Sequence, residues 1–254
     1  MKYLRQLIHQ LESKPLISDV FHRKTNNKAI SDHEDSKKWP ESWTKAHFKT
    51  YPRFKTLSLQ NTGMDEIQKL VHNRRSIRNF NRKMLSYRDL SYILYSSCGL
   101  IHTDGNFDHT RRPYPSAGAR YPLEIYSIAL NVQGLKRGLY HYNVRDNTLE
   151  LLLEKVSSRW ILDVFGKQDW LLSASVIFII TAVLDRTRIK YGDRGYRLAL
   201  LEAGHMGQNI CIFAAKRGLG TCPLAGYVDA EIDRLLDIQL GRETTVYAIA
   251  LGTL

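Results

Sequence analysis

Two adjacent residues, Lys190 and Tyr191, are the pair in this sequence best suited to removing a proton from a substrate. The side-chain pKa values of lysine and tyrosine are both about 10 in water, so the two groups can share a proton. Partial burial would lower the pKa of the lysine and make it a usable base. Taken alone, the pair is more typical of a solvated entry to a helix.

A second candidate is the basic segment from Arg74 to Arg78, in which Arg74, Arg75 and Arg78 accompany Ser76. Guanidinium groups bind phosphate oxygens in a bidentate manner, and a serine hydroxyl can donate one more hydrogen bond. The segment therefore predicts a phosphate site. The alternative is a solvated basic face without a ligand.

Two loops of small residues, Tyr114–Ala119 and Gly220–Gly226, could bring backbone N–H groups close to a flat or anionic ligand. In the second loop, the N–H groups of Ala225 and Gly226 would be exposed. A plain connection between elements is the alternative for both loops. Cys222 is expected to pack rather than to act as a nucleophile, because no histidine and aspartate stand near it in the sequence.

Other kinds of site are not indicated by the sequence. The nine histidines are dispersed without a metal-binding spacing, and His205 is expected to be a core residue rather than a ligand. There is no Walker motif and no G-x-G-x-x-G segment after a strand, so a Rossmann domain for a nicotinamide cofactor is not expected.

The elements that must position these groups alternate between helices and strands. A capping box at Ser86–Asp89 begins one helix, and Arg145–Asn147 reads as the turn of a hairpin. Helices are predicted over 64–73, 86–99, 157–166, 198–217 and 229–236, and strands over 123–130, 139–143, 148–153, 174–183 and 246–251, with loops at 101–122 and 218–226. This order predicts an α+β fold with one sheet.

The predicted helix at 198–217 has two distinct faces, which decide how it packs. One face carries larger side chains (Leu198, Leu201, His205, Gln208 and Ile212), and the other carries small ones (Ala199, Ala203, Gly207, Cys211 and Ala215). Gly204 and Gly207 each cost roughly 1 kcal/mol relative to alanine, and close packing would offset that cost. The helix is either a buried core element or packs against its own copy in a dimer.

Composition limits the partners of the chain. The net charge of +12 over 254 residues is compatible with nucleic acid, an anionic membrane, or an acidic peptide or phosphate ligand. The basic residues are spread along the chain without a nucleic-acid-binding motif, so nucleic acid is not expected. The longest apolar run, 174–184, is too short to span a membrane, and the N-terminal apolar run is too interrupted for a signal peptide. Three cysteines without a C-x-x-C spacing indicate free thiols in a reducing cytoplasm.

Residues 1–62 are predicted to form an N-terminal extension packed on the core. Leu4, Leu7, Ile8 and Leu11 suit a short amphipathic helix, and Pro40 and Pro52 favour irregular structure further along. Five aromatic residues are expected to hold the extension against the core: Trp39, Trp43, Phe48, Tyr51 and Phe54.

In this order, the segments resemble the nitroreductase-like flavoproteins and, more closely, the SagB-type dehydrogenases, the azoline oxidases of thiazole/oxazole-modified peptide biosynthesis. The matching motifs are R-R-S-x-R at 74–78, P-S-A-G-x-x-Y-P-L-E at 115–124, K-Y followed by G-x-R-G-Y-R at 190–197, E-A-G-H-x-x-Q-N at 202–209 and G-L-G…P-x-x-G at 218–226. The extension is similar to the front end of that group at His33–Lys37 and Tyr51-Pro52.

The resemblance implies a nitroreductase-like FMN-binding domain over 63–254, with a central, mostly antiparallel sheet flanked by helices and a long central helix at a dimer interface. Two flavins would lie between two copies of the chain. Arg74, Ser76 and Arg78 correspond to ligands of the FMN phosphate, ribityl chain and pyrimidine edge, and Lys190 and Tyr191 correspond to the catalytic pair. Two segments complete the implied site: Pro115, Ser116, Ala117 and Gly118 reach the flavin from the other subunit, and Pro223, Leu224, Ala225 and Gly226 face flavin N5.

The implied reaction is oxidation of a thiazoline or oxazoline ring in a ribosomal precursor peptide, within a complex with a cyclodehydratase. The ring loses a proton from one carbon, and flavin takes a hydride from its neighbour. An NAD(P)H-dependent nitroreductase-type enzyme or a dehydroamino-acid reductase is the alternative, and a basic scaffold for an acidic leader peptide is a third reading. Nitroreductases often carry a basic residue after the last strand, whereas Gly252-Thr253-Leu254 follows it here, so other groups must neutralise the phosphate.

Overall fold

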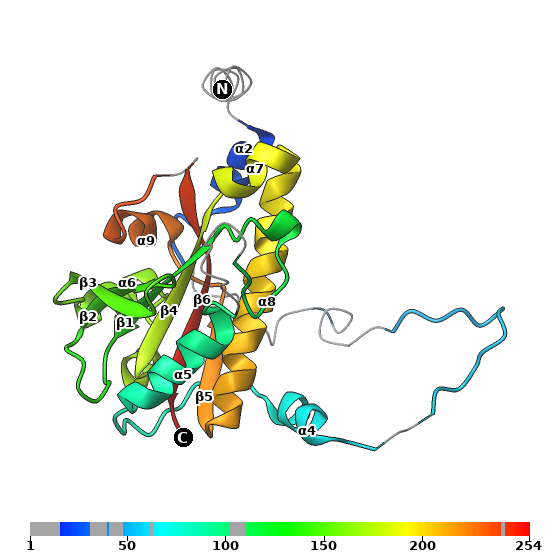
Figure 1. Ribbon diagram of the computed structural model, residues 1–254, viewed down its shortest axis with the longest axis horizontal. Coiled ribbons are helices and arrows are strands. Elements are labelled where there is room, and N and C mark those ends of the chain that lie inside the picture. Colours follow the sequence, from blue (N-terminus) through cyan, green and yellow to red (C-terminus); the bar gives the residue numbers. More distant parts are fainter. Residues whose placement is uncertain (1–15, 31–39, 41–47, 61–62, 102–109, 240–241) are drawn as a thin grey trace.

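The computed structural model describes residues 16–30, 40, 48–60, 63–101, 110–239 and 242–254, and a single sheet forms its centre. The strand order is β3-β2-β1-β4-β6-β5, and each neighbouring pair is antiparallel (Figure 1). The strands are β1 (Leu123–Ala129), β2 (Gly138–Asn143), β3 (Thr148–Leu153), β4 (Val176–Val183), β5 (Leu219–Leu224) and β6 (Glu243–Thr253). The predicted α+β fold with one antiparallel sheet is confirmed.

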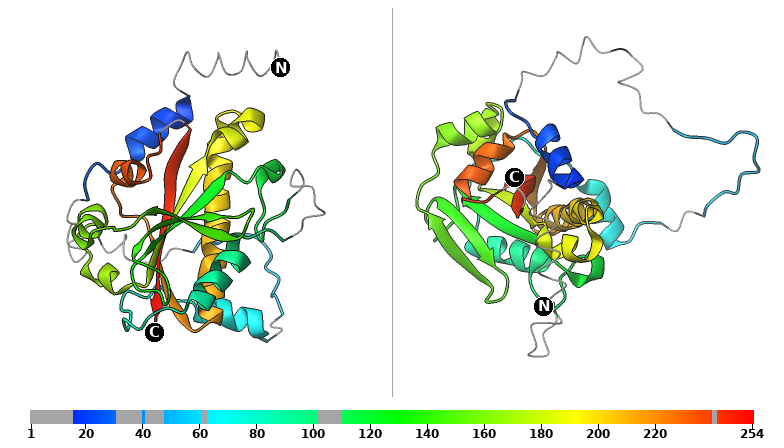
Figure 2. Two further views of the ribbon diagram at one scale, coloured as in Figure 1. Left: turned by 60° about the vertical axis from the view of Figure 1, so that its left-hand side comes forward. Right: turned by 90° about the horizontal axis from the view of Figure 1, so that it is seen from above.

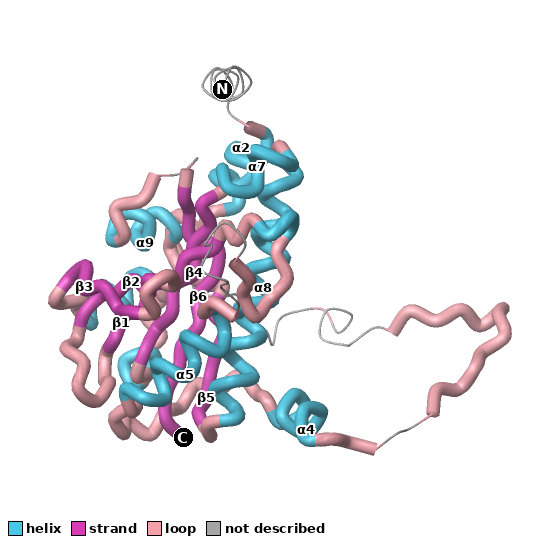
Figure 3. Tube along the Cα trace, in the orientation of Figure 1, coloured by secondary structure: helices cyan, strands magenta, loops and turns pink. Residues whose placement is uncertain are grey.

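Helices lie on both sides of the sheet (Figures 2 and 3). In the described part of the chain they are α2 (Ile17–Thr25), α4 (Glu66–Asn73), α5 (Tyr87–Cys98), α6 (Ser158–Val164), α7 (Asp185–Tyr191), α8 (Arg194–Lys216) and α9 (Asp229–Leu235). Two short 3₁₀ turns, η3 (Ala117–Ala119) and η4 (Asp169–Ser173), complete the set. The long helix α8 runs the length of the sheet beside β5 and β6 (Figure 1).

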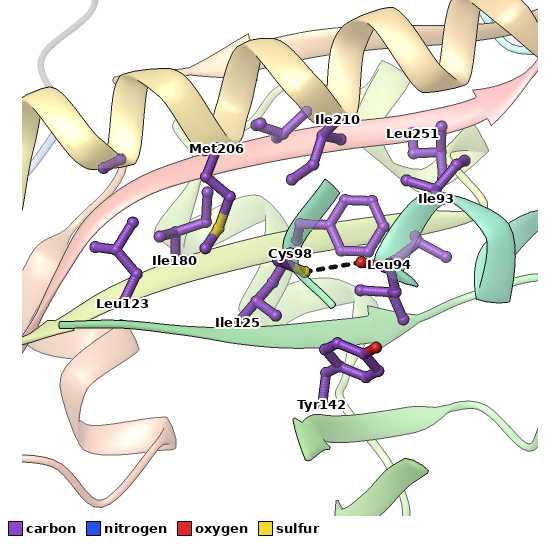
Figure 4. Packing of buried hydrophobic residues seen from close by; sticks show 14 of the residues in the cluster. Ile93, Leu94, Cys98, Leu123, Ile125, Tyr142, Ile180, Met206, Ile210 and Leu251 are labelled. Atoms are coloured by element: carbon purple, nitrogen blue, oxygen red, sulfur yellow. Dashed lines mark hydrogen bonds between the residues drawn. The ribbon is translucent and has the colours of Figure 1, made fainter. Parts of the chain in front are cut away.

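Strand β4 divides the core into two halves, because successive side chains of a strand point to opposite faces. Phe178 and Ile180 pack under α5 and α8, whereas Ile177 and Ile179 pack with the residues of α6 and α9. Figure 4 shows the first half, where Met206 of α8 lies near Ile180. The strand is therefore buried on both faces, as its continuous apolar run predicts.

Several local predictions are confirmed by hydrogen bonds. The Asp89 N–H donates to the Ser86 hydroxyl over 3.0 Å, so Ser86 caps α5 as the sequence indicates. The Trp160 N–H donates to the Ser157 hydroxyl over 2.9 Å and caps α6 in the same way. The hairpin of β2 and β3 turns at 144–147, where Asn147 has a φ of 52°.

The predicted loop at 218–226 is wrong for most of its length, because residues Leu219–Leu224 form β5. Only Gly218, with a φ of 68°, belongs to a turn. Pro223 weakened the strand signal, since proline cannot donate to a ladder. It is tolerated because β5 is the last strand in the sheet order and is paired only with β6 among the named strands. Strand β6 also begins three residues earlier than predicted, at Glu243.

A second difference is the short helix α7, which the residue pattern does not predict. Lys190 and Tyr191 form its last turn, and Gly192, with a φ of 56°, separates it from α8. A seven-residue helix gives little periodicity, and the run of charged residues there was interpreted as an entry to the long helix. The pair is thus helical and lies before a sharp reversal of the chain.

The small face of α8 packs on the sheet of its own chain. A Cβ added to Gly207 would lie 2.5 Å from Cε1 of Tyr247 on β6, so the glycine permits close helix–sheet contact. The core interpretation of this face is therefore correct for Ala199, Ala203 and Cys211, which are buried. His205, expected in the core, is exposed instead.

The opposite face of α8 is open in the single chain. Leu201 is 63% exposed, and a Cβ on Gly204 would meet no atom within 4 Å. Neither the small size of Gly204 nor the exposure of Leu201 is explained by contacts within the described chain. This face is where a second molecule could approach α8 closely.

Helix α2 joins the N-terminal region to the core. The backbone N–H and the hydroxyl of Ser18 donate to Asp193 over 3.0 and 2.6 Å, and Asp19 pairs with the buried Arg188. His22 bridges Tyr196 and Thr244 over 2.9 and 2.7 Å. These polar contacts hold the helix against α7, α8 and β6.

The rest of the extension behaves differently from the prediction where the structure describes it. Phe48, Tyr51 and Phe54 are exposed, so these aromatic side chains do not pack on the core of the single chain. The predicted helix at Leu4–Leu11, and Trp39, Trp43 and His33–Lys37, lie outside the described residues. No helix in the described part combines the length and the apolar character needed to cross a bilayer.

Candidate active site

The proposed proton-transfer pair lies against the small-residue segment Pro115–Gly118. A Cβ added to Gly118 would lie 2.8 Å from the hydroxyl of Tyr191 and 3.1 Å from Nζ of Lys190. Nζ of Lys190 lies 5.4 Å from the centre of the Tyr191 ring. The fold thus brings together two segments that are more than seventy positions apart in the sequence. Lys190 is exposed, so the described chain alone does not supply the burial that the sequence-based hypothesis assumes.

The segment that carries Gly118 is a tight turn with unusual backbone angles. Gly118, Ala119 and Tyr121 have φ values of 62°, 51° and 44°, and such angles cost side-chain-bearing residues of order 1 kcal/mol each. Hydrogen bonds hold the turn: the Tyr121 N–H donates to the Ser116 hydroxyl over 2.8 Å, and the Ala119 N–H donates to the Ser116 carbonyl over 3.1 Å. Ser116 therefore fixes the turn that presents Gly118 to the pair.

Glu202 of α8 lies behind this turn and was not assigned a role from the sequence. Its side chain is buried, with 2% of the residue exposed, and neither carboxylate oxygen has a hydrogen-bond partner among the described residues. Burial raises the pKa of Glu202 to about 7, although the nearby Ser116 hydroxyl and Arg112 guanidinium favour the charged form. The sequence does contain a sign of this buried carboxyl, since an acidic residue between Ala199 and Met206 falls on the buried face of the helix.

Two further polar atoms near Glu202 also lack partners among the residues described, namely the Tyr114 hydroxyl and Nε of Arg112. Burial raises the pKa of Tyr114 well above its usual value, and Glu202 contributes to that increase. Buried polar groups without partners destabilise the fold. Their concentration at one place is therefore better explained by a function than by a contribution to stability.

The basic segment Arg74–Arg78 lies along the edge strand β5. The Ile77 N–H donates to the Thr221 carbonyl over 2.9 Å, and Ser76 forms a parallel bridge with Thr221. Arg74 and Arg75 line a hollow of about 250 Å³ beside Cys211 and Thr221. The sheet edge therefore fixes the backbone of this segment.

The three guanidinium groups of this segment have no carboxylate partner among the described residues. The Arg75 guanidinium donates to the carbonyls of His72 and, over 2.9 Å, Arg74, which are neutral groups. An uncompensated set of arginines beside a hollow fits a phosphate group better than a structural ion-pair network. Arg78 is exposed and also lies near β5, since its charge opposes the burial that raises the pKa of Cys222.

The predicted segment Pro223–Gly226 continues from the same strand. Pro223 and Leu224 end β5, and Leu224 is buried. Ala225 is exposed, and a Cβ on Gly226 would meet no atom within 4 Å. The open backbone that the sequence predicts is therefore limited to Ala225 and Gly226. Cys222 is buried, which agrees with a packing role rather than a nucleophilic one.

The predicted site residues form two separate groups in one chain. Lys190, Tyr191 and Gly118 lie at the N-terminal end of α8, whereas Arg74–Arg78 lies near its C-terminal end (Figures 1 and 2). Because an α-helix rises about 1.5 Å per residue, the 23 residues of α8 span roughly 33 Å. One small ligand cannot contact both ends of this helix within a single chain. The described residues contain no group of three or more histidine, cysteine or acidic side chains that could hold a metal ion.

Comparison with known proteins gives matches over most of the chain. Residues 71–253 match the model of the Nitroreductase family. The chain is 35% identical over 187 residues to the Methanocaldococcus jannaschii protein MJ1384, which is named as a nitroreductase, covering 72% of this chain and 91% of that protein. It is 33% identical over 139 residues to the Microcin B17-processing protein McbC of Escherichia coli, covering 50% of this chain and 49% of McbC.

Solved structures agree with this assignment at the level of the fold. A chain of the E. coli microcin synthetase McbBCD complex with truncated pro-MccB17 bound superposes with a TM-score of 0.74 and 23% identity, covering 94% of this chain and 92% of that one. A Desulfovibrio desulfuricans protein in complex with FMN, also named as a nitroreductase, superposes with a TM-score of 0.51 and 16% identity, covering 75% and 87% of the two chains.

Proposed function

The chain belongs to the nitroreductase family of oxidoreductases, and from this premise we propose that it is an FMN-dependent dehydrogenase that converts thiazoline and oxazoline rings of a peptide to thiazoles and oxazoles. One observation carries the proposal: Lys190 and Tyr191 pack on Gly118 of the Pro115–Gly118 segment. A nitroreductase that takes its electrons from a nicotinamide does not need a lysine–tyrosine pair for its hydride transfer. A ring oxidation that also removes a proton from carbon does need a base.

Bound FMN would supply the acceptor for the hydride that leaves the ring. The residues of this chain that fit the cofactor are Arg74, Arg75 and Arg78 for its phosphate and Ser76 for a hydroxyl or phosphate oxygen, because these groups have no competing carboxylates among the described residues. The open backbone at Ala225 and Gly226 fits the edge of a flat ring system.

The ring proton would be taken at Nζ of Lys190 or at the hydroxyl of Tyr191. Both atoms lie beside Gly118, where even the Cβ of a larger residue would collide with them. A second molecule covering this end of α8 would exclude water from the two side chains. The pair then acts as base, and the turn fixed by Ser116 orients it.

The active form is proposed to be a homodimer with two flavins at its interface. The separation of the two groups along α8 supports this, because a second copy could place its Pro115–Gly118 segment and its Lys190–Tyr191 pair beside Arg74–Arg78 of the first. The open face around Leu201 and Gly204 supports α8 as part of that interface. In this arrangement one face of α8 packs on the sheet of its own chain and the other packs on the second molecule.

The substrate and partners are proposed from the relatives. McbC is named as a processing protein, and the similar chain of known structure belongs to a synthetase complex with a bound pro-peptide. By analogy, this chain would act on a ribosomal precursor peptide together with a cyclodehydratase, in the cytoplasm. The N-terminal region, with helix α2 docked on α7 and α8, would be an extension of the 63–254 domain.

A nicotinamide-dependent nitroreductase is the second candidate, because MJ1384 matches more of this chain than McbC does. One experiment distinguishes the two functions. The purified protein should absorb at about 450 nm as a flavoprotein and should remove about 2 Da from each azoline ring of a test peptide without added nicotinamide. Lys190→Ala and Tyr191→Phe should keep the flavin absorbance and lose ring oxidation. Wild-type ring oxidation by both variants would contradict the proposal.

A further inference from the structure

A large cavity opens beside the turn that carries Gly118, and its walls are mainly cationic. It has a volume of about 1060 Å³, and Gly118 and Ala119 form part of its wall. We refer to it as the cationic cavity. Its basic lining residues are Arg111, Arg112, Arg120, Arg145, Arg186 and His141. Glu124 is the one acidic residue among those described in its lining.

The charge of Glu124 is already satisfied inside the cavity. Arg186 Nη1 lies 2.6 Å from one oxygen of Glu124, and His141 Nε2 lies 3.1 Å from the other. The other ring nitrogen of His141 lies 2.9 Å from Glu150. The pKa of Glu124 is lowered although burial opposes this, because His141 and Arg186 outweigh the burial. Glu124 is therefore ionised and committed to its two partners.

Three of the arginines have no acidic partner in the part of the chain that the structure describes. Arg111 and Arg120 are exposed, and neither forms an ion pair with a carboxylate in the part of the chain that the structure describes. Arg112 donates to the Cys98 carbonyl over 3.2 Å and lies over the ring of Tyr121, so it too has no counter-ion there. The cavity therefore carries an excess of positive charge that a ligand can neutralise.

Contacts of Tyr121 link the cationic cavity to the proposed active site. The guanidinium of Arg112 lies 5.5 Å from the centre of the Tyr121 ring, and Arg186 donates to the Tyr121 carbonyl over 3.1 Å. Tyr121 in turn closes the turn around Gly118 by donating its N–H to Ser116. An anion held in the cavity would thus contact the same turn that packs against Lys190 and Tyr191.

We propose that the cationic cavity binds carboxylate side chains of the peptide substrate, so that acidic residues flanking the azoline ring anchor the peptide beside the Lys190–Tyr191 pair. This inference rests on the proposed function and names the chemistry by which the enzyme would select its substrate. Arginine forks match carboxylates bidentately, and several of them spread over one large cavity suit an extended chain with more than one acidic group.

Single-stranded nucleic acid fits this cavity less well. Proteins that bind it present aromatic rings for base stacking, whereas the Tyr121 ring at the cavity is already covered by the Arg112 guanidinium. A peptide also matches the mixed lining, in which Asn143, Val144 and Thr110 accompany the arginines. The acidic peptide is therefore the favoured ligand, and phosphate compounds serve as competitors in the test.

The test measures binding without flavin or turnover. The probe is a short fluorescein-labelled peptide with glutamates on both sides of a central serine–cysteine, compared by anisotropy with a twin in which glutamine replaces each glutamate. The wild-type protein should prefer the glutamate peptide, and higher ionic strength should weaken that preference. The double variant Arg111→Glu/Arg120→Glu should bind the glutamate peptide about tenfold more weakly or worse. Lys155→Glu, an exposed residue outside the cavity, is the matched control and should bind as the wild type does.

Three results of the binding test would overturn the inference. These are equal affinity for the two peptides, unchanged binding by the double variant, and displacement of the peptide by inorganic phosphate or oligothymidylate at lower concentrations than by an unlabelled glutamate peptide. Ring oxidation that ignores flanking charge would leave the proposed function intact and contradict this inference alone. Charge-selective binding without any ring oxidation would retain the cavity as a peptide site and contradict the proposed function alone.

Discussion

Gly118 and Tyr191 are in direct contact: a Cβ on the glycine would stand 2.8 Å from the tyrosine hydroxyl. The contact joins a strained turn to the end of a short helix, and it is the point at which the small-residue segment meets the proposed base. Gly118 also has a φ of 62°, which favours glycine at this position. The contact therefore provides the first test of the site.

Replacing Gly118 by alanine should damage both the backbone and the catalytic pair. The positive φ costs alanine about 1 kcal/mol, and the new methyl group would displace the Tyr191 hydroxyl or Nζ of Lys190. We expect the free energy of unfolding to fall slightly and ring oxidation to fall at least tenfold, measured by chemical denaturation and by mass loss of an azoline peptide. Gly134→Ala is the control, because Gly134 has a φ of 74° and open space around it. Equal activity losses in the two variants would show that the contact has no special role.

The buried carboxyl of Glu202 should make stability depend on pH. The pKa of Glu202 is about 7 in the folded chain, compared with 4.5 for an ordinary glutamate. As the pH rises, the unfolded chain therefore loses the Glu202 proton at a lower pH than the folded chain does. The free energy of unfolding should therefore fall between pH 4.5 and pH 7, by up to about 3 kcal/mol from this group alone. Glu202→Gln should flatten that slope and gain stability relative to wild type at pH 8.

The measurement is urea denaturation of both proteins at several pH values from 4.5 to 8. Glu154→Gln, which alters an exposed carboxylate, is the control and should leave the slope as it is. If Glu202→Gln and wild type keep parallel pH profiles, then Glu202 is ionised in the folded chain and the interpretation of its burial is wrong.

Arg74 should contribute directly to flavin affinity. Its guanidinium lines the hollow beside β5 and has no carboxylate partner among the described residues, so a phosphate would be its main ionic contact. Removing one charge-assisted contact of this kind should weaken FMN binding about tenfold or more. Quenching of FMN fluorescence on titration with Arg74→Ala measures the change. Arg159→Ala, at a residue with 92% of its side chain exposed, should bind FMN as wild type does.

Charge placed on the open face of α8 should prevent association of two chains. Leu201 is 63% exposed next to Gly204. If α8 forms the proposed dimer interface, a glutamate at this position would introduce a charge into that interface. We expect Leu201→Glu to be monomeric by light scattering after gel filtration and to lose FMN, while keeping its secondary structure. Leu152→Glu alters a leucine of β3 that is 51% exposed and should remain dimeric. A dimeric Leu201→Glu protein would place the interface elsewhere.

Much of the fold could be predicted because local signals agreed with tertiary packing. Ser86 and Ser157 cap their helices as expected, and the apolar run of β4 is buried on both faces. Strand β5 was missed because its glycine and proline are poor strand formers, and pairing with β6 and with Ser76 and Ile77 compensates for them. Helix α7 was missed because seven residues carry too little periodicity.

The sequence motifs predict which segments form the site, but they do not predict how these segments are arranged in space. The segments around Arg74, Ser116 and Lys190 could be identified in sequence order, but nothing in the sequence places Gly118 on Tyr191. Glu202 belongs to one of the matching motifs, but the sequence predicts no role for it. The energetic cost of burying its carboxyl can be judged only when its neighbours in the fold are known. The cationic cavity likewise depends on β1, β2 and α7 meeting in space.

The length of α8 has a genetic consequence. In the proposed dimer, each catalytic centre would take Lys190 from one molecule and Arg74 from the other. A substitution at either position in one molecule would then affect only one of the two centres. Co-expressing Lys190→Ala with Arg74→Ala should then create mixed pairs in which one centre carries both lesions and the other carries none. Two inactive proteins would complement each other, and each mixed pair would regain up to about half of the normal capacity.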